Sequence, residues 1–281
     1  MNRTASVRKL GRWLPRVALP CVLVVLLLAA VTARTATNDP IACSSGLGQQ
    51  PSPMGQTLSG HLDILSWNIQ KASNDGWAED LAAMAGDVNL AFIQEARLQA
   101  LLPDAIPREP LYQVFTRGFA TEDAETGVMT LSSHTPSWLC NFTTVEPWLR
   151  TPKAVTVTEH PLAGRDERLL AINIHAVNFT FGVEDLRRQL EPLVQLLADH
   201  TGPAILAGDF NTWSDSRQQL VDDLLGLHGL SALEFSDDRR TRAFGRPLDH
   251  IYVRGLSAES AEVIPVASSD HNALRARLRI D

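Results

Sequence analysis

The chain has 281 residues, of which 44% are hydrophobic and 20% are charged, a composition typical of one large globular domain or at most two. Its formal net charge is −7, and the part after residue 33 holds 20 basic against 32 acidic residues, a net charge of −12. This acidity excludes a protein that coats nucleic acid through a general basic face, but a metal-dependent nuclease with a local cationic cleft remains compatible with it.

The first segment differs in composition from the rest of the chain. Five basic residues precede an uncharged apolar run from Val17 to Ala33, and no acidic residue occurs before Asp39. This order is typical of an export signal, and residues 31–33 offer small side chains for cleavage. The run is slightly shorter than the roughly 20 residues that a membrane-spanning helix needs. We therefore predict that residues 1–33 are a signal peptide or an N-terminal membrane anchor, and that the protein is exported to the cell envelope, as a periplasmic, secreted or anchored protein.

Residues 34–60 are rich in Ser, Pro, Gly and Gln, which predicts a linker before a domain spanning residues 61–281. Of the three cysteines, Cys21 lies in the apolar run, which leaves Cys43 and Cys140. In an oxidising compartment these two can form one disulfide, and they can equally be two unrelated thiols.

From His61 onward, short apolar runs alternate with stretches of helical periodicity. The predicted strands are residues 61–69, 89–96, 111–116, 127–133, 154–160, 168–176, 203–210, 249–255, 261–266 and 273–280. Apolar stripes predict helices around residues 77–84, 186–197 and 220–227. So few helices cannot connect so many strands in one parallel sheet. We expect an α/β fold, a four-layered sandwich of two packed, mostly antiparallel or mixed sheets flanked by helices.

Polar residues stand at the ends of several of these strands. In "LAGDFNTWSD" (206–215), Asp209 and Asn211 share one side of a strand, while Phe210 points to the other side, into the core. Other polar residues at strand ends are Asn68, Glu95, His175, Asn178, Asp249, His250, Ser269, Asp270 and His271. We expect this set, except for His250, to gather at one rim of the sandwich. His250 faces away from Asp249 and is assigned a structural role.

The residue types in this set suit phosphate chemistry. Glu95, Asp209 and Asp270 offer the oxygen ligands that Mg²⁺ or Mn²⁺ prefers, and Mg²⁺ usually keeps waters that substrate phosphate can replace. His175 and His271 can donate hydrogen bonds to phosphate oxygens. A metal ion, a water activator and a charge clamp are the groups that phosphodiester hydrolysis requires.

Six short motifs occur in order along the chain: "WNIQ", "IQEA", "NIHAVN", "GDFN", "PLDHIYV" and "SDHNAL". Through them, residues 61–279 resemble the endonuclease/exonuclease/phosphatase superfamily, which includes DNase I, apurinic endonucleases, neutral sphingomyelinases and inositol polyphosphate 5-phosphatases. The segments "NIHAVNF" and "RRTRAFGRPLD" are most similar to its bacterial YafD-like branch.

The resemblance implies a metal and water site. Glu95 would be the principal ligand of Mg²⁺ or Mn²⁺, with Asn68 and Asp270 completing or flanking the site. Asp209 would activate or orient the attacking water, and Asn211 would hold that water and the phosphate.

The resemblance also implies how the transition state is stabilised. His175 and His271 would stabilise its charge, and Asp249 would hydrogen-bond to His271, fix its tautomer and favour its cationic form. Asn178, in the same motif as His175, is predicted to bind substrate.

A cluster of arginines, "DDRRTRAFGRPLD" (237–249), precedes Asp249. It is either a solvated charged loop or a substrate clamp, because arginine binds phosphate through two parallel hydrogen bonds. We predict that Arg242 and Arg246 contact substrate.

The sequence thus predicts an exported, monomeric, Mg²⁺-dependent phosphodiesterase acting on DNA, RNA or a phospholipid headgroup, with membrane association through the N-terminal segment. The alternative is a non-catalytic envelope protein that keeps the fold as a binding or scaffold module.

Overall fold

The computed structural model describes residues 42–44, 46–48, 57–107 and 111–281. The predicted signal or anchor, residues 1–33, lies outside the described residues, so its prediction stands as made. Contacts divide the chain into two units, Met1–Thr35 and Ala36–Asp281, and the fold below is that of the second unit. Within the described ranges, no helix combines the length and apolar character needed to cross a membrane.

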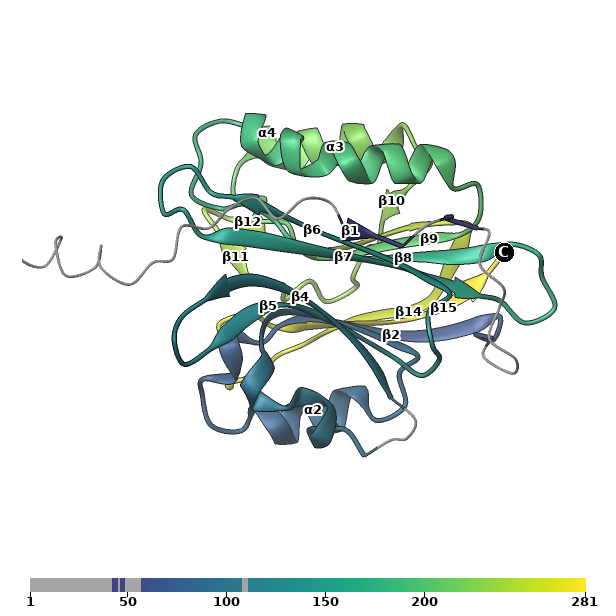
Figure 1. Ribbon diagram of the computed structural model, residues 1–281, viewed down its shortest axis with the longest axis horizontal. Helices are drawn as coiled ribbons and strands as arrows, with labels where there is room; N and C mark the ends of the chain where they lie inside the picture. Colours follow the sequence, from purple (N-terminus) through teal and green to yellow (C-terminus); the bar gives the residue numbers. More distant parts are fainter. Residues whose placement is uncertain (1–41, 45, 49–56, 108–110) are drawn as a thin grey trace, which may run out of the picture. The chain divides into compact units, whose positions relative to one another are not determined.

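Two large sheets pack face to face (Figure 1). The first has the strand order β1 (Ala42–Cys43), β6 (Trp138–Val145), β7 (Pro152–Pro161), β8 (Arg168–His175), β9 (Ala204–Asp209), β13 (Asp249–Arg254) and β10 (Ser231–Ala232). The second has the order β14 (Leu256–Ile264), β15 (Ala273–Ile280), β2 (His61–Asn68), β3 (Leu90–Arg97), β5 (Glu125–Ser132) and β4 (Tyr112–Ala120). In these sheets, β2 pairs with β3 and β8 with β9 in parallel, and the other neighbouring strands are antiparallel.

Helices cover the outer faces of both sheets. α3 (Glu184–Asp199) and α4 (Asp215–Gly226) lie over the first sheet, and α2 (Trp77–Ala85) lies over the second (Figure 1). The remaining elements are the hairpin β11 (Arg242–Ala243) and β12 (Arg246–Pro247), and the short 3₁₀ helices η1 (Gln70–Ala72), η2 (Leu98–Ala100) and η3 (Leu102–Ala105). The four-layered sandwich predicted from the sequence is confirmed.

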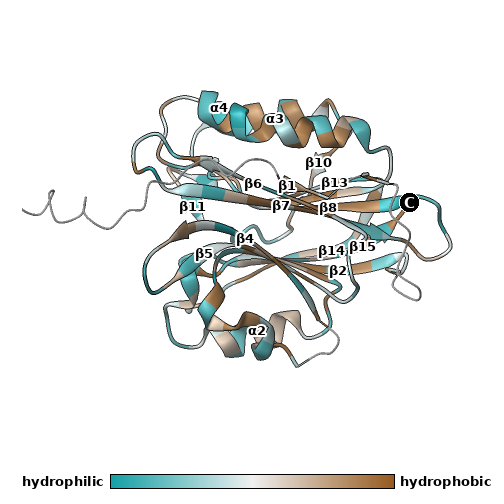
Figure 2. Ribbon diagram, viewed as in Figure 1, coloured by the Kyte–Doolittle hydropathy of each residue, from teal (hydrophilic) through white to brown (hydrophobic). Residues whose placement is uncertain are grey.

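The helices form where the apolar spacing predicts them. In α3, buried leucines at 186, 190, 193 and 197 recur every three or four residues and form one stripe toward the sheet. Hydrophilic and hydrophobic residues alternate along α3 and α4 (Figure 2), as expected of helices with one buried face. α4 begins at Ser214, whose Oγ accepts a hydrogen bond from the backbone N–H of Arg217, 3.4 Å away.

Alternation along β9 decides which side chains reach the space between the sheets. Ile205 and Ala207 belong to the core between the two sheets, whereas Leu206 and Phe210 belong to the core under α3 and α4. Asp209 has the parity of Ile205 and Ala207, so it extends the inter-sheet face at the point where the strand ends. The predicted burial of Phe210 on the opposite side is confirmed.

The short strands β1, β10, β11 and β12 and the long strand β6 were not predicted. The buried residues of β6, Trp138, Cys140 and Phe142, recur at every second position, but only its first three residues are consecutively apolar. The segment predicted as a linker contributes β1 and the buried Leu58, which bridges to Leu162. A disulfide joins Cys43 to Cys140 and fastens β1 to β6, which settles the alternative that the sequence left open.

Candidate active site

Strand register sets three functional side chains side by side at one rim of the first sheet. Asp209 at the end of β9 lies directly opposite His175 of β8 on one side and Asp249 of β13 on the other. All three are buried, with residue exposures between 2% and 7%. The sequence-predicted gathering of these residues is therefore produced by pairing of strands that are distant in the sequence.

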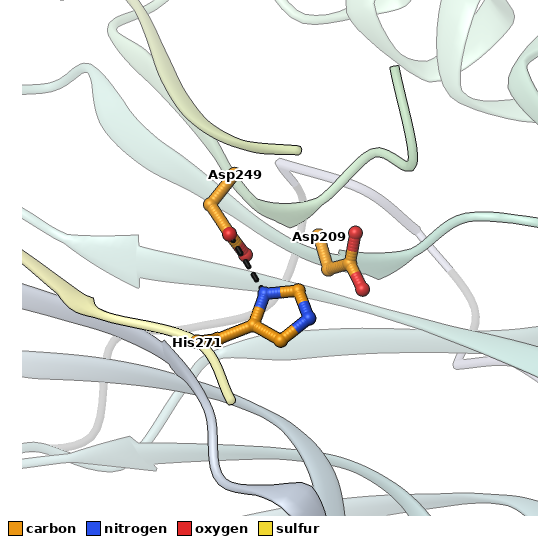
Figure 3. A group of neighbouring side chains, drawn as sticks. All are labelled: Asp209, Asp249 and His271. Carbon is orange, nitrogen blue, oxygen red and sulfur yellow. Dashed lines mark hydrogen bonds and ion pairs between the residues drawn. The ribbon is translucent and has the colours of Figure 1, made fainter. Parts of the chain in front are cut away.

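The second sheet supplies two more groups to the same place. Asn68, at the end of β2, donates from Nδ2 to Oδ2 of Asp209 over 3.1 Å. His271, just before β15, donates from Nδ1 to Oδ2 of Asp249 over 2.8 Å (Figure 3). Asp209, Asp249 and His271 present one atom each within 4.8 Å of one another. We call Asn68, His175, Asp209, Asp249 and His271 the active cluster.

Gly208 allows Asp209 to sit this close to β8. Its φ is +147°, and a Cβ at this position would lie 2.0 Å from the carbonyl oxygen of Ile174. No side chain fits there, so the glycine of "GDFN" is required by the close approach of two backbones.

The protonation states of the cluster follow from burial and neighbouring charge. Burial raises the pKa of Asp209 to about 6, a shift that the charge of His271 opposes and that of Asp249 reinforces. Burial alone would lower the pKa of His271, but the charge and hydrogen bond of Asp249 raise it to about 10. His271 is therefore an imidazolium at neutral pH, as the sequence predicted, while Asp209 titrates close to neutrality.

His175 remains neutral. Burial lowers its pKa well below the ordinary value, and the nearby Lys153 cation lowers it further. Nε2 of His175 accepts a hydrogen bond from Nζ of Lys153 over 2.8 Å and lies 3.5 Å from Oδ2 of Asp209. Because the imidazole is neutral, the contact with Asp209 is not an ion pair, and Lys153 brings the positive charge to this side of the cluster.

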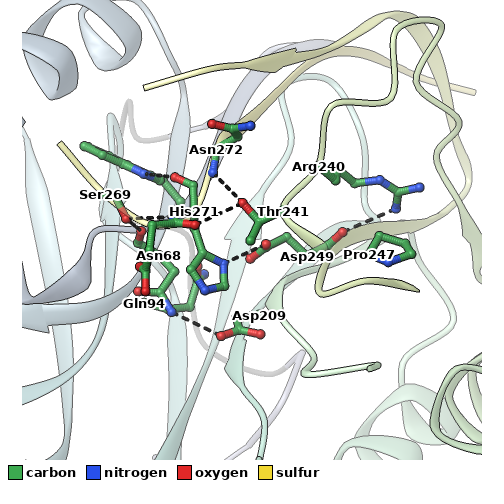
Figure 4. Close-up of polar contacts among 12 residues, drawn as sticks. Asn68, Gln94, Asp209, Arg240, Thr241, Pro247, Asp249, Ser269, His271 and Asn272 are labelled. Atoms are coloured by element: carbon green, nitrogen blue, oxygen red, sulfur yellow. Dashed lines mark hydrogen bonds and ion pairs between the residues drawn. The ribbon is translucent and has the colours of Figure 1, made fainter. Parts of the chain in front are cut away.

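Hydrogen bonds beneath the cluster hold its members in place (Figure 4). Nε1 of Trp67 donates to the carbonyl oxygen of His271 over 3.0 Å, and Oγ of Ser269 donates to that of Asn68 over 2.6 Å. Arg240 donates to the carbonyl oxygen of Asp249 over 3.3 Å. The loop before β15 is thereby tied to β2, and the β10–β11 connection is tied to the start of β13.

Asn211 is held by a residue that the sequence did not mark. Its backbone N–H donates to Oδ1 of Asp209, and its Nδ2 donates to the carbonyl oxygen of Ala176. The fully buried Arg217 donates from Nε to the carbonyl oxygen of Asn211 over 2.8 Å and from its guanidinium to Val177 and Thr180. A cation in the first turn of a helix opposes the helix dipole. The position of Arg217 in the first turn of α4 was the one feature of the sequence that could have marked it.

The predicted metal ligands do not lie together. Asn68 is inside the active cluster, whereas Glu95 projects from a bulge in β3, where its φ is +49° and its carboxylate pairs with Lys71 at 2.9 Å. Asp270 is exposed, and its backbone oxygen accepts from Thr241. Among the described residues, neither carboxylate belongs to the group formed by Asp209, Asp249 and His271.

The donor chemistry nevertheless fits a hard cation at Glu95. A protonated His271 has no lone pair to offer, so the group around it suits proton handling better than metal binding. Glu95 follows Gln94, which pairs in register with Asn68, and it is partly exposed at the same rim. An Mg²⁺ ion that displaced Lys71 from Glu95 would have one protein carboxylate and would keep waters as its other ligands, an arrangement that Mg²⁺ accepts.

The predicted substrate-binding residues have partners within the protein. Asn178 donates its backbone N–H to the buried Glu146 over 2.6 Å. Arg242 pairs with Asp238 at 2.7 Å, and Arg246 pairs with Asp215. His250 is buried and lies against Arg240 and Thr212, in agreement with its assigned structural role.

Comparison with known proteins accounts for this arrangement. The model of the Endonuclease/Exonuclease/phosphatase family matches residues 65–271, which include every member of the active cluster. The chain belongs to this family. Its members are hydrolases that include nucleases and phosphatases.

One similar sequence and two similar solved structures illustrate this membership. A UPF0294 protein of Vibrio vulnificus (strain YJ016) is 40% identical over 216 residues, covering 76% of each chain. An endonuclease/exonuclease/phosphatase from Beutenbergia cavernae DSM 12333 superposes with a TM-score of 0.62 at 16% identity, over 78% of this chain and 72% of that one. A mannosyl-6-phosphatase of Bacteroides thetaiotaomicron VPI-5482 superposes with a TM-score of 0.59 at 17% identity, over 77% and 99% of the two chains. At these identities the two structures show the fold alone.

Proposed function

We propose that this family member is a divalent-metal-dependent phosphodiesterase that hydrolyses a nucleic acid or a phospholipid headgroup. The observation that carries the proposal is the pairing of a carboxylate that titrates near neutrality, Asp209, with an imidazolium held by a second carboxylate, Asp249. Neighbouring groups with displaced pKa values are typical of acid–base catalysis.

Asp209 is the proposed general base. Asn68 and the backbone N–H of Asn211 each donate to one of its oxygens, which fixes the plane of the carboxylate. A base with a pKa near 6 is mostly ionised at neutral pH and accepts a proton from an attacking water more readily than an ordinary carboxylate does.

His271 and Lys153 are the proposed charge stabilisers. The charge and hydrogen bond of Asp249 keep His271 protonated at neutral pH, so its imidazolium offers its Nε2–H to a phosphate oxygen. Lys153 approaches from the opposite side through His175. In the transition state, His271 and Lys153 would thus both stabilise the negative charge that develops on the phosphate.

Glu95 is the proposed holder of Mg²⁺ or Mn²⁺, which when bound would polarise a phosphate oxygen, while Asn68 orients Asp209 instead of completing the metal site. The non-catalytic alternative is disfavoured because a scaffold has no need for two buried carboxylates on adjacent strands, where like charges oppose folding.

Export to an oxidising envelope compartment is part of the proposal. The disulfide between Cys43 and Cys140 supports it, because disulfides persist in oxidising compartments and are rare in the cytosol. Intact mass measured on envelope and cytosolic fractions tests it, and a full-length cytosolic chain with free thiols would overturn it.

The function is tested with the full chain on bis(p-nitrophenyl) phosphate, duplex and single-stranded DNA, RNA, sphingomyelin and phosphoinositides, in Mg²⁺, Mn²⁺ or excess EDTA. We expect at least one diester to be cleaved, and cleavage to stop in EDTA. In Glu95→Gln the Mg²⁺ concentration for half-maximal rate should rise at least tenfold, whereas the matched exposed control Glu191→Gln should not change it. Cleavage that persists in EDTA contradicts the metal dependence, and the absence of any hydrolysis contradicts the function.

A further inference from the structure

Exposed aromatic side chains gather beside the active cluster, where loops from the first sheet meet. Phe244 is 88% exposed, Phe181 76%, Trp148 62% and Phe179 55%. Trp148 contacts Phe181 edge to face with ring centroids 4.3 Å apart, and Trp213 contacts Phe244 at 6.2 Å. We call these five residues the aromatic rim.

The rim encloses an apolar pocket of about 490 Å³. Besides the five aromatic side chains, its wall includes Asn178, Asn211 and Leu248. Since the backbone N–H of Asn211 donates to Asp209, the pocket begins where the active cluster ends. A molecule with its phosphate at Asp209 would therefore place the adjoining part of its structure against aromatic walls.

The rim is not explained by folding. Its residues come from four separate connections, β6–β7, β8–α3, β9–α4 and the β11–β12 turn. None of these rings belongs to a hydrophobic core cluster of the described residues. Contiguous exposed apolar surface of this kind marks an interaction site in soluble domains.

Buried polar groups hold the pocket's loops in position. Arg217 fastens residues 177, 180 and 211 through its guanidinium and lies 5.2 Å from the ring centroid of Trp213. Glu146 accepts from the N–H of Asn178 and from Thr151, which joins the β6–β7 loop to the β8–α3 loop. The pocket is thus preformed rather than assembled on binding.

Charge around the rim distinguishes two occupants, a lipid chain and a nucleobase. A nucleic acid strand needs a row of available cations along its phosphates. The arginines of the adjoining loop are instead matched with carboxylates: Arg239 with Asp237, Arg240 and Arg242 with Asp238, and Arg246 with Asp215. A single phosphate with an apolar body requires no such row.

Resting on the function proposed above, we propose that the aromatic rim docks on a phospholipid surface and that its pocket takes the apolar part of a phospholipid whose phosphate lies at Asp209. Trp and Phe side chains favour the boundary between lipid headgroups and chains, and the rim exposes both. The substrate class is then a membrane phospholipid rather than a polynucleotide.

The test uses tryptophan fluorescence of the full chain in phosphatidylcholine vesicles with brominated acyl chains, in EDTA so that no hydrolysis occurs. The fluorescence of Trp148 is obtained by subtracting the intensity of Trp148→Phe from that of the wild type. The subtraction removes the fluorescence of the other tryptophans, including the one in the N-terminal segment. We expect brominated chains to quench this signal at least twofold relative to unbrominated vesicles. The double variant Phe181→Ser/Phe244→Ser should abolish most of the quenching, because it removes the two most exposed rings of the rim.

The matched control is Leu227→Ser, which alters an equally exposed apolar side chain, 81% accessible, at the far end of α4. It should leave the quenching of Trp148 unchanged, and a loss equal to that of the double variant would overturn the docking surface. Quenching of Trp148 by a single-stranded oligonucleotide but not by brominated chains would overturn the lipid in favour of a nucleobase. Hydrolysis of bis(p-nitrophenyl) phosphate with an unquenched Trp148 would overturn the rim proposal and leave the phosphodiesterase intact.

Discussion

Opposite rims of the first sheet both bury charge, with opposite consequences. At one rim, Glu159 of β7 is fully buried and accepts from Arg168 over 3.1 Å and from Ser137 over 3.1 Å. At the other rim, Asp209 of β9 and Asp249 of β13 lie directly opposite each other on adjacent strands, and their compensating cation, His271, comes from the other sheet. The far rim pairs opposite charges within one sheet, while the active rim sets like charges side by side.

This contrast shows that buried charge alone does not mark a catalytic site. A buried pair with opposite charges is a structural arrangement that holds two elements together. At the active rim, burial raises the pKa of Asp209 and the charge of Asp249 adds to the rise, and displaced pKa values of this kind are typical of functional sites. Substitutions at the active rim should therefore change the rate of hydrolysis, and substitutions at the far rim should change stability.

The largest effect is expected at the active rim. Asp209→Asn keeps the shape of the side chain and one of the two hydrogen bonds that its oxygens accept but removes the base, so kcat for the best diester should fall by about 10²–10⁴-fold. Thermal melting should show an unchanged or higher Tm, since a buried charge is removed. The exposed carboxylate control Asp199→Asn should have wild-type kcat, and a similar fall in both variants would contradict the assignment.

The far rim should respond in stability instead. Arg168→Ala leaves the Glu159 carboxylate buried without its cation, which should lower the free energy of unfolding by about 3–5 kcal/mol in urea titrations. The exposed pair in α3 provides the control: Arg188→Ala should cost under about 1 kcal/mol. If Arg168→Ala instead abolished activity in a chain that remained folded, the distinction between the rims would fail.

The pH dependence of stability carries a third, smaller signature of the far rim. Burial lowers the pKa of His160 to about 3, so the unfolded chain binds a proton that the folded chain does not. This contribution to stability is complete above about pH 6.5 and is lost as the pH falls toward 3, amounting to about 2 kcal/mol by pH 5. His160→Gln should flatten this part of the curve of unfolding free energy against pH, and an unchanged slope would show that His160 does not carry it.

The smallest effect is expected for the arginine loop. Arg242→Ala and Arg246→Ala remove exposed guanidiniums that already pair with carboxylates, so each should change kcat/KM by less than about threefold and unfolding free energy by under about 0.5 kcal/mol. A tenfold loss of kcat/KM at low salt that is relieved at high salt would restore the phosphate clamp inferred from the sequence.

The sequence by itself determined the elements and the chemistry that they carry. Period-two and helical spacing fixed most strands and all three helices, and the parity of Asp209 against Phe210 already separated the site face from the core face. β6 was not predicted although its buried residues recur at every second position, because only its first three residues are consecutively apolar. These features are local, because they depend on residues within a few positions of one another.

Tertiary structure alone decided which groups meet. The register of β8, β9 and β13 placed His175, Asp209 and Asp249 in one row, and the packing of the second sheet added Asn68 and His271. The sequence assigned Glu95 and Asp270 to one metal site because both are carboxylates. In the structure, Glu95 lies in a bulge of β3 and Asp270 in an exposed loop, and neither belongs to the group of Asp209, Asp249 and His271. Arg217 and the aromatic rim depend on loops from four connections meeting in space. Each of these outcomes requires contacts across tens to hundreds of residues, which no local pattern in the chain encodes.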